Sequence, residues 1–179
     1  MKGARRPRRP QAPVRARSGV CGMQKAEYGI PLIHKMGYKE EFIKFMVESG
    51  VLTFGDFVTK SGRNTPYFIN TGNYKTGAQA HRLGQFYASC IKEHMDAGEI
   101  DPETKVLFGP AYKGIPLAVA TSISLAAEHG MDVSYCFNRK EKKDHGEGGS
   151  MVGYKLQDGD KVLITEDVIT AGTAVRETL

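Results

Sequence analysis

The spacing of apolar residues predicts two amphipathic helices in the first half of the chain. Phe42, Phe45 and Met46 stand at positions i, i+3 and i+4, and Gly50 follows as a natural C-cap, so we expect a helix over residues 39–49. The same helical spacing recurs over residues 77–97. Residues 51–59 and 67–70, which lie between the two helices, are typical of short strands around a turn.

The second half of the chain changes to short runs that are almost continuously apolar. These runs predict strands over residues 105–108, 133–137 and 161–165. A helix is expected over residues 115–128; it is apolar nearly all round and closes at Gly130. Such strands in alternation with helices indicate βαβ units and a buried parallel sheet within one domain. The long segment 138–160 is rich in glycine and charge, so we expect it to be functional or to form its own hairpin.

Three segments follow the expected strands directly. They are residues 109–114, 139–149 and 166–173. Because ligands of open α/β sheets bind beyond the carboxyl ends of the strands, we expect these segments to converge on one site.

The net charge of +5 comes from the start of the chain. Residues 1–18 hold seven of the 25 basic residues and no acid, which leaves 18 basic and 20 acidic residues in the remainder. This Arg- and Pro-rich stretch predicts a disordered basic leader over residues 1–36. A passive tail or an over-extended start, with Met23 or Met36 as an internal start, is the favoured interpretation. A nucleic-acid-binding arm and an organelle transit segment are the alternatives.

Cysteine usage and hydropathy narrow the class of protein. The three cysteines are odd in number, widely spaced and without a C-x-x-C pair, which argues against a disulfide framework or a zinc site and for a reducing compartment. No apolar run approaches the roughly 18 residues of a membrane span. We therefore expect a cytoplasmic protein without a membrane partner, and nucleic acid is not an expected partner of its folded part.

The stretch ITEDVITAGTA, residues 164–174, combines two kinds of chemistry. Thr170 to Thr173 joins a strand to a helix start, where exposed N–H groups, hydroxyls and a glycine suit a phosphate group. A simple N-cap is the alternative if this turn stood alone. Glu166 and Asp167 close an apolar strand, where acids are costly unless they have a task, and they suit sugar hydroxyls or a metal-bound substrate. A phosphorylated ribose satisfies both halves.

These residues carry a resemblance. ITEDVITAGTA resembles the phosphoribosyl-diphosphate motif of the type I phosphoribosyltransferases. Residues 60–68, 109–116 and 138–146 are similar, in the same order, to segments of the orotate phosphoribosyltransferase family. The resemblance implies an α/β type I phosphoribosyltransferase fold over residues 37–179. In that fold a mostly parallel sheet is flanked by helices, with a flexible hairpin loop and N-terminal hood elements.

The resemblance also implies a reaction. Enzymes of this family transfer the 5-phosphoribosyl group from phosphoribosyl diphosphate to orotate with Mg²⁺, giving orotidine 5′-monophosphate and diphosphate in de novo pyrimidine biosynthesis. It further implies a homodimer in which the basic loop is shared across subunits. A non-catalytic regulator that binds phosphoribosyl diphosphate, or an inactive fragment of the same fold, is the alternative.

Site residues follow from the resemblance position by position. The expected catalytic residues are Lys143, His145 and Asp167. The expected phosphoribosyl-diphosphate site comprises Lys60, Tyr112, Lys113, Arg139, Lys140, Lys143, His145, Glu166, Asp167, Val168, Ile169, Thr170, Ala171, Gly172, Thr173 and Ala174. The expected orotate site comprises Phe68, Ile69 and Thr170, with Ile69 where the family often has a second aromatic residue. No residue is assigned as a direct metal ligand, because the diphosphate is expected to carry the Mg²⁺.

The position of the motif within the chain leads to one more expectation. Family members continue for some thirty residues past it, with further strands and an arginine for the orotate carboxylate. We expect this chain to lack those C-terminal strands and that arginine. It would then bind phosphoribosyl diphosphate while being impaired for orotate.

Overall fold

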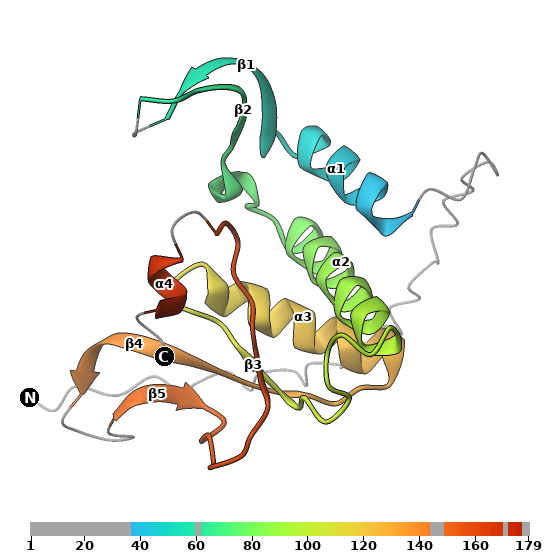
Figure 1. The fold of residues 1–179 in the computed structure, drawn as a ribbon, viewed down its shortest axis with the longest axis vertical. Coiled ribbons are helices and arrows are strands. Elements are labelled where there is room, and N and C mark those ends of the chain that lie inside the picture. The colour runs from blue at the N-terminus through green and yellow to red at the C-terminus, as the bar shows by residue number, and fades with distance from the viewer. Residues whose placement is uncertain (1–36, 60–61, 144–148, 170–171, 177–179) are drawn as a thin grey trace, which may run out of the picture. The chain divides into compact units, whose positions relative to one another are not determined.

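The computed structural model describes residues 37–59, 62–143, 149–169 and 172–176. These residues all belong to one compact unit, Lys35–Leu179. Its elements follow in the order helix, hairpin, helix, strand, helix, three strands and a last short helix, with a 3-10 turn between the hairpin and the second helix (Figure 1).

The first elements are a helix and a two-stranded hairpin. Helix α1 spans Tyr38–Glu48, and the antiparallel strands β1 and β2 span Leu52–Val58 and Asn64–Ile69. Strand β2 begins earlier than the predicted residue 67. Its pairing with β1 shifts register between Phe54 and Phe57, and Pro66 lies opposite this irregularity. Because proline cannot donate a ladder hydrogen bond, a bulge is where a strand accommodates it.

Helix α2, Gly77–Asp96, begins with a capping box. The Thr76 hydroxyl accepts a hydrogen bond from the Gln79 N–H, and the Gln79 side chain accepts one from the Thr76 N–H. Phe42 and Phe45 of α1 pack on Phe86 of α2, with ring centroids 5.2 and 5.5 Å apart. The two helices predicted over residues 39–49 and 77–97 are therefore confirmed, and aromatic contacts join them.

The sheet contains four strands in the order β5-β4-β3-β6. Their bounds are Val106–Phe108 for β3, Ser134–Lys143 for β4, Gly149–Gly153 for β5 and Val162–Ile164 for β6. Strand β3 runs parallel to β4 and β6, and β5 pairs antiparallel with β4. Helix α3 spans Gly114–His129 and helix α4 spans Thr173–Arg176. The mostly parallel α/β sheet is thus confirmed, and segment 138–160 forms the hairpin that its composition predicted.

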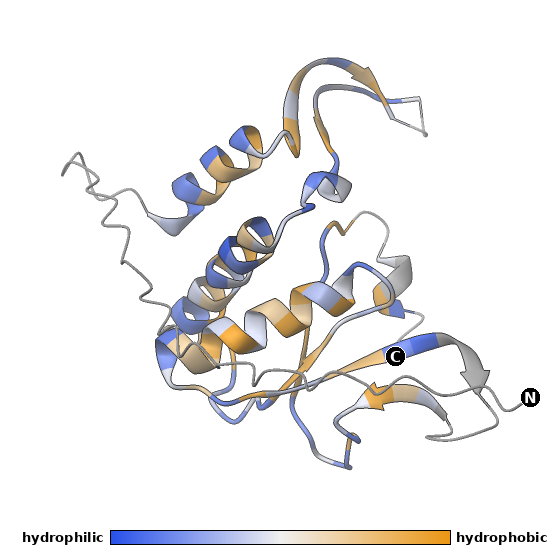
Figure 2. Cartoon of the chain, turned by 180° about the vertical axis from the view of Figure 1, so that it is seen from behind, coloured by the Kyte–Doolittle hydropathy of each residue, from blue (hydrophilic) through white to orange (hydrophobic). Residues whose placement is uncertain are grey.

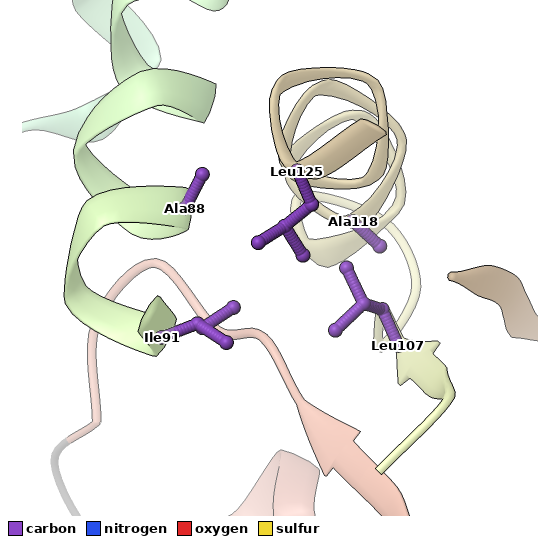
Figure 3. Packing of buried hydrophobic residues seen from close by; sticks show 5 residues of the cluster. All are labelled: Ala88, Ile91, Leu107, Ala118 and Leu125. Carbon is purple, nitrogen blue, oxygen red and sulfur yellow. The ribbon is translucent and has the colours of Figure 1, made fainter. Parts of the chain in front are cut away.

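Strand β3 lies at the centre of the core and is buried on both faces. Leu107 packs with Ala88 and Ile91 of α2 and with Ala118 and Leu125 of α3 (Figure 3). Burial of such a leucine contributes roughly 1.5–3 kcal/mol. The alternate residues, Val106 and Phe108, instead pack with Cys136 of β4. A short strand with apolar residues on both faces is what a buried parallel sheet requires.

The helices differ in how apolar they are. Figure 2 shows polar residues along much of α2 and mostly apolar residues along α3. This difference follows their burial, since α3 buries seven of its 16 residues whereas α2 buries four of its 20. Within the described part of the chain, each helix is too short or too polar to cross a membrane.

Candidate functional site

Two loops meet where the parallel strands β3 and β6 end. Because these strands are paired in parallel, their carboxyl ends lie at the same edge of the sheet. The first loop runs from Gly109 to Lys113 and leads into α3, and the second follows β6 and carries Glu166 and Asp167. The predicted convergence of residues 109–114 with the acidic pair is therefore observed.

The loop after β3 is held closely against the sheet. The Gly109 N–H donates to the Cys136 carbonyl oxygen at 3.0 Å, and the Ala111 N–H donates to Asn138 Oδ1 at 2.8 Å. A Cβ atom at Gly109 would lie 2.2 Å from the Gly114 carbonyl oxygen, so the two segments approach closer than any side chain allows. The peptide bond between Ala111 and Tyr112 is cis. The contacts of Gly109 and Ala111 fix the point from which Lys113 extends.

Lys113, Thr71 and Asp167 form one polar cluster across the two loops. Lys113 Nζ donates to Thr71 Oγ1 at 2.9 Å, and Thr71 Oγ1 donates to Asp167 Oδ2 at 2.5 Å. Lys113 Nζ also lies 3.3 Å from Asp167 Oδ2. The Asp167 side chain is 17% exposed, whereas that of Lys113 is 63% exposed. A shielded carboxylate and a reachable ammonium group therefore stand side by side.

The pKa values of the two adjacent acids are shifted in opposite directions. Burial acts to raise the pKa of Asp167, but the hydrogen bonds with Thr71, Glu166 and Lys113 outweigh it and lower that pKa below its ordinary value. For Glu166, burial and then the hydrogen bond shared with Asp167 raise the pKa above its ordinary value. Asp167 is thus the acid that stays ionised, and Glu166 is the one that first takes up a proton.

Tyr87 of α2 holds the peptide bond that joins Glu166 to Asp167. Its hydroxyl donates to the Glu166 carbonyl oxygen at 2.8 Å, and Glu166 Oε1 accepts from the Asp167 N–H at 3.1 Å. Burial, followed by the charge of Asp167, raises the pKa of Tyr87 to about 12, so its hydroxyl remains a donor. The direction in which the acidic pair points is therefore set from α2.

A pocket of about 470 Å³ adjoins the polar cluster. Thr71, Lys113 and Asp167 line it together with apolar residues of α1, α2 and α3, among them Phe42 and Leu117. Apolar walls with a few convergent polar groups are typical of small-molecule sites.

The two residues expected to flank orotate are placed differently. Ile69 lines the pocket, together with Val168 from the loop after β6. Phe68 lies on the hairpin, 51% exposed, and its ring centroid is 5.6 Å from that of Phe57. Period-two alternation along β2 sends these neighbours to opposite faces. In this structure Ile69, and not Phe68, borders the pocket.

The remaining expected residues are only partly described. Tyr112 is 66% exposed, Ile169 is 69% exposed and Arg139 is half-buried in β4. Gly172 adopts the left-handed conformation, with φ of 67°, and its carbonyl oxygen accepts from the Arg176 N–H at 3.0 Å. Lys60, His145, Thr170 and Ala171 lie outside the described residues, as do the side chains of Lys140, Lys143, Thr173 and Ala174. Their roles stay predictions.

Thr71, Tyr87 and Asn138 belong to the site but were not expected there. Thr71 and Asp167 are 96 positions apart, and Tyr87 and Glu166 are 79 apart, so no local pattern links them. Tyr87 carries the helical spacing of a core residue. Asn138 directly precedes Arg139, and its bond to Ala111 places the start of the basic segment beside the Lys113 loop.

Among the described residues, the site offers no protein cage for a metal ion. The described residues contain no group of three or more His, Cys, Asp or Glu side chains placed to hold one. Mg²⁺ usually takes one or two carboxylates at most and keeps its other positions for water and substrate phosphates. The donor set fits an ion that arrives with a phosphorylated substrate.

Comparison with known proteins places the chain in a family. The family model of the phosphoribosyl transferase domain matches residues 70–179. An orotate phosphoribosyltransferase of Clostridium beijerinckii is 66% identical over 142 residues, and one of Shewanella oneidensis is 54% identical over the same length. These matches take in 79% of this chain and 61% and 62% of the relatives. The chain thus spans about three fifths of the length of the curated relatives it matches.

Solved structures agree with this placement. The orotate phosphoribosyltransferase of Francisella tularensis is 42% identical with a TM-score of 0.67, and the match covers 80% of this chain and 62% of that one. The UMP synthase of Leishmania donovani is 25% identical with a TM-score of 0.56, and the match covers 79% of this chain and 28% of that one. The type I fold expected from the sequence is therefore confirmed. The chain belongs to the phosphoribosyl transferase domain family, and the curated relatives described above are orotate phosphoribosyltransferases.

Proposed function

We propose that this protein transfers the 5-phosphoribosyl group from phosphoribosyl diphosphate to orotate. The products are orotidine 5′-monophosphate and diphosphate, as a step of de novo UMP biosynthesis. One observation carries the proposal: Lys113 and Asp167, from the loops after β3 and β6, meet on Thr71 beside a pocket bordered by Ile69. An ammonium group for a diphosphate, a carboxylate for a ribose and an apolar wall for a flat base thus lie within one site.

Each part of the substrate has a matching group. The ribose hydroxyls suit the Glu166–Asp167 pair, since ionised carboxylates accept hydrogen bonds. The 5′-phosphate suits the turn before α4, where Gly172 allows close backbone approach. The diphosphate suits Lys113, whose ammonium is exposed. Further cationic contacts are proposed for Lys60, Arg139, Lys140, Lys143 and His145.

The chemistry requires little from the protein beyond placement and charge. Orotate is already an anionic nucleophile, and substitution at the anomeric carbon through an oxocarbenium-like state needs no covalent intermediate. Asp167, held ionised by its neighbours, orients the ribose and stabilises positive charge that develops on it. Lys113 stabilises the charge of the departing diphosphate. Mg²⁺, if it arrives with the diphosphate, would supply further positive charge beside Lys113.

Closure of the basic loop completes the proposed site. Residues 139–149 carry Lys143 and His145 and would cover the reacting sugar, which excludes water from a hydrolysable cation. In the proposed assembly, a homodimer, part of this loop acts on the partner subunit. We further propose that the catalytic domain spans residues 37–179, that residues 1–36 are a dispensable leader, and that the protein works in the cytoplasm.

The test is a coupled binding and turnover measurement. Mixing the chain with Mg²⁺, phosphoribosyl diphosphate and orotate should cause a fall in orotate absorbance that depends on all three. Asp167→Asn, which removes the charge and keeps the shape, should lower the rate by about a hundredfold or more. A folded Asp167→Asn variant with the wild-type rate would refute the role of this carboxylate. Binding of phosphoribosyl diphosphate without any turnover would favour the alternative, a non-catalytic regulator or an inactive fragment of the same fold.

A further inference from the structure

We infer that Thr71 is a positioning residue. Its hydroxyl keeps the Asp167 carboxylate in place for the ribose when Lys113 leaves Asp167 to bind the diphosphate. The inference rests on the proposed function and extends it to a residue outside the family motif. It is carried by the geometry of three groups that come from three separate segments of the chain.

The direction of the hydrogen bonds in this cluster is fixed by chemistry. A lysine ammonium group has donors and no acceptor, and an ionised carboxylate has acceptors and no donor. The Thr71 hydroxyl must therefore accept from Lys113 and donate to Asp167, at 2.9 and 2.5 Å. Each charge polarises the hydroxyl in the direction that strengthens the other bond. Of the polar side chains that line the pocket, Thr71 contacts both charged partners.

The backbone places Thr71 rigidly. The residue opens a short 3-10 turn, Thr71–Asn73, directly after β2. Asn70 caps this turn, because its side chain accepts from the Gly72 N–H at 3.2 Å. Asn73 Nδ2 donates to the Gly50 carbonyl oxygen at 2.7 Å and so ties the turn to the end of α1. A hydroxyl on such a support keeps its position when its neighbours move.

The exposure of the three groups suggests which one moves. The Lys113 side chain is mostly exposed, so its flexible stem can carry the ammonium group to an incoming diphosphate. The Asp167 side chain is shielded and keeps its bond to Thr71. Without the hydroxyl, loss of Lys113 to the ligand would leave the Asp167 carboxylate without a hydrogen bond or ion pair to a hydroxyl or cation of the described residues, because the Tyr87 hydroxyl is bonded to the Glu166 carbonyl oxygen. Thr71 thus separates the two tasks of binding diphosphate and holding ribose.

The protonation of Asp167 depends on groups from several elements. Glu166 adjoins it in the same loop, Lys113 faces it from the start of α3, Thr71 faces it from the 3-10 turn, and Tyr87 faces it from α2. Glu166 and Lys113 are the charged neighbours, and both remain in a Thr71 variant. A change in the titration of Asp167 in such a variant therefore reports the hydroxyl itself.

The experiment compares variants of Thr71 in the full chain by calorimetric titration. Thr71→Val keeps the shape and removes the hydroxyl, Thr71→Ser restores the hydroxyl, and Thr121→Val removes a buried hydroxyl from α3 as the matched control. Each is titrated with Mg²⁺–phosphoribosyl diphosphate and, in parallel, with Mg²⁺–diphosphate, which has no ribose. Circular dichroism checks folding, and Thr71→Ala replaces Thr71→Val if the latter does not fold.

We expect Thr71→Val to bind phosphoribosyl diphosphate roughly ten- to a hundredfold more weakly, the loss typical of one hydrogen bond to a charged group. Its affinity for diphosphate should change much less, because that ligand takes Lys113 and leaves Asp167 unused. Thr71→Ser and Thr121→Val should stay close to wild type. Equal losses for both ligands, or a Thr71→Ser variant as weak as Thr71→Val, would overturn the inference.

A second readout needs no ligand. The ¹³C signal of the Asp167 carboxyl, assigned with Asp167→Asn, should titrate at higher pH in Thr71→Val than in wild type and Thr71→Ser. An unchanged titration would contradict the inference that the hydrogen bond from Thr71 stabilises the ionised Asp167 carboxylate. If the wild-type chain binds neither ligand, the proposed function fails, whereas the claim about Thr71 and Asp167 is still decided by this titration.

Discussion

Replacing Gly109 by alanine should displace the loop that carries Lys113. Gly109 directly follows β3, and its N–H is bonded to the Cys136 carbonyl oxygen of β4. An added Cβ would lie 2.2 Å from the Gly114 carbonyl oxygen and 3.0 Å from the Ala118 Cβ. Both contacts belong to the start of α3, directly after Lys113. The methyl group cannot enter without a shift of that helix start.

The size of the effect follows from these distances. Ordinary contacts between heavy atoms lie at about 3.5–4.0 Å, so the added Cβ and the Gly114 carbonyl oxygen must move apart by roughly 1.3–1.8 Å. Overpacking of this kind typically costs about 1–3 kcal/mol of unfolding free energy. A displacement of ~1 Å at a binding group can cost as much as a hundredfold in function. We therefore expect Gly109→Ala to lose both stability and at least about tenfold in diphosphate affinity.

Gly98 provides the matched control. It has φ of 74° in the turn after α2, and an added Cβ there meets no atom within 4 Å. Gly98→Ala should cost about 1–2 kcal/mol through backbone strain without displacing a neighbour. Urea unfolding measures the stability of both variants, and calorimetric titration measures their affinity for Mg²⁺–diphosphate. If Gly109→Ala binds diphosphate like wild type, the close approach at Gly109 does not position Lys113, and the reasoning is wrong.

Three further predictions concern single side chains. Lys143→Ala should lower turnover about tenfold or more while leaving the urea midpoint unchanged, and a wild-type rate would remove Lys143 from the catalytic residues. The pKa of Glu166 is raised above its ordinary 4.5, so its ionisation costs stability as pH rises from 4.5 through the folded value. Glu166→Gln should therefore be more stable than wild type by a larger margin at pH 7 than at pH 4, with a difference between the two margins of less than about 1 kcal/mol after solvent screening. Urea unfolding of both proteins at both pH values measures these margins, and a larger margin at pH 4 would contradict the prediction. Thr121 is fully buried and its hydroxyl has no partner among the described residues, so Thr121→Val should gain about 1 kcal/mol by urea unfolding; a loss would indicate a missed partner.

The elements of the fold were predictable because their signals are local. The stripe of Phe42, Phe45 and Met46 and the all-round apolar run of α3 each lie within one segment, and both helices form close to the predicted bounds. The less accurate element was β2. Its first residues, including Pro66, look like a turn, and only pairing across the bulge in β1 makes them a strand.

The candidate site was predictable in its motif and not in its supports. Asp167 and Lys113 stand in short segments with recognisable chemistry, and strand topology brings them together. Thr71 and Tyr87 act only through tertiary contacts, since each bonds a residue 79 or more positions away. Such residues carry ordinary turn and core signals, so their part in the site appears once the chain is folded.

The most direct test of a phosphoribosyl-diphosphate site at the ends of β3 and β6 is a calorimetric titration of the 179-residue chain with Mg²⁺ and phosphoribosyl diphosphate. We expect saturable binding that Mg²⁺–diphosphate displaces, that free ribose does not displace, and that Asp167→Asn weakens. A folded chain that shows no binding, or an affinity unchanged by Asp167→Asn, would contradict the account.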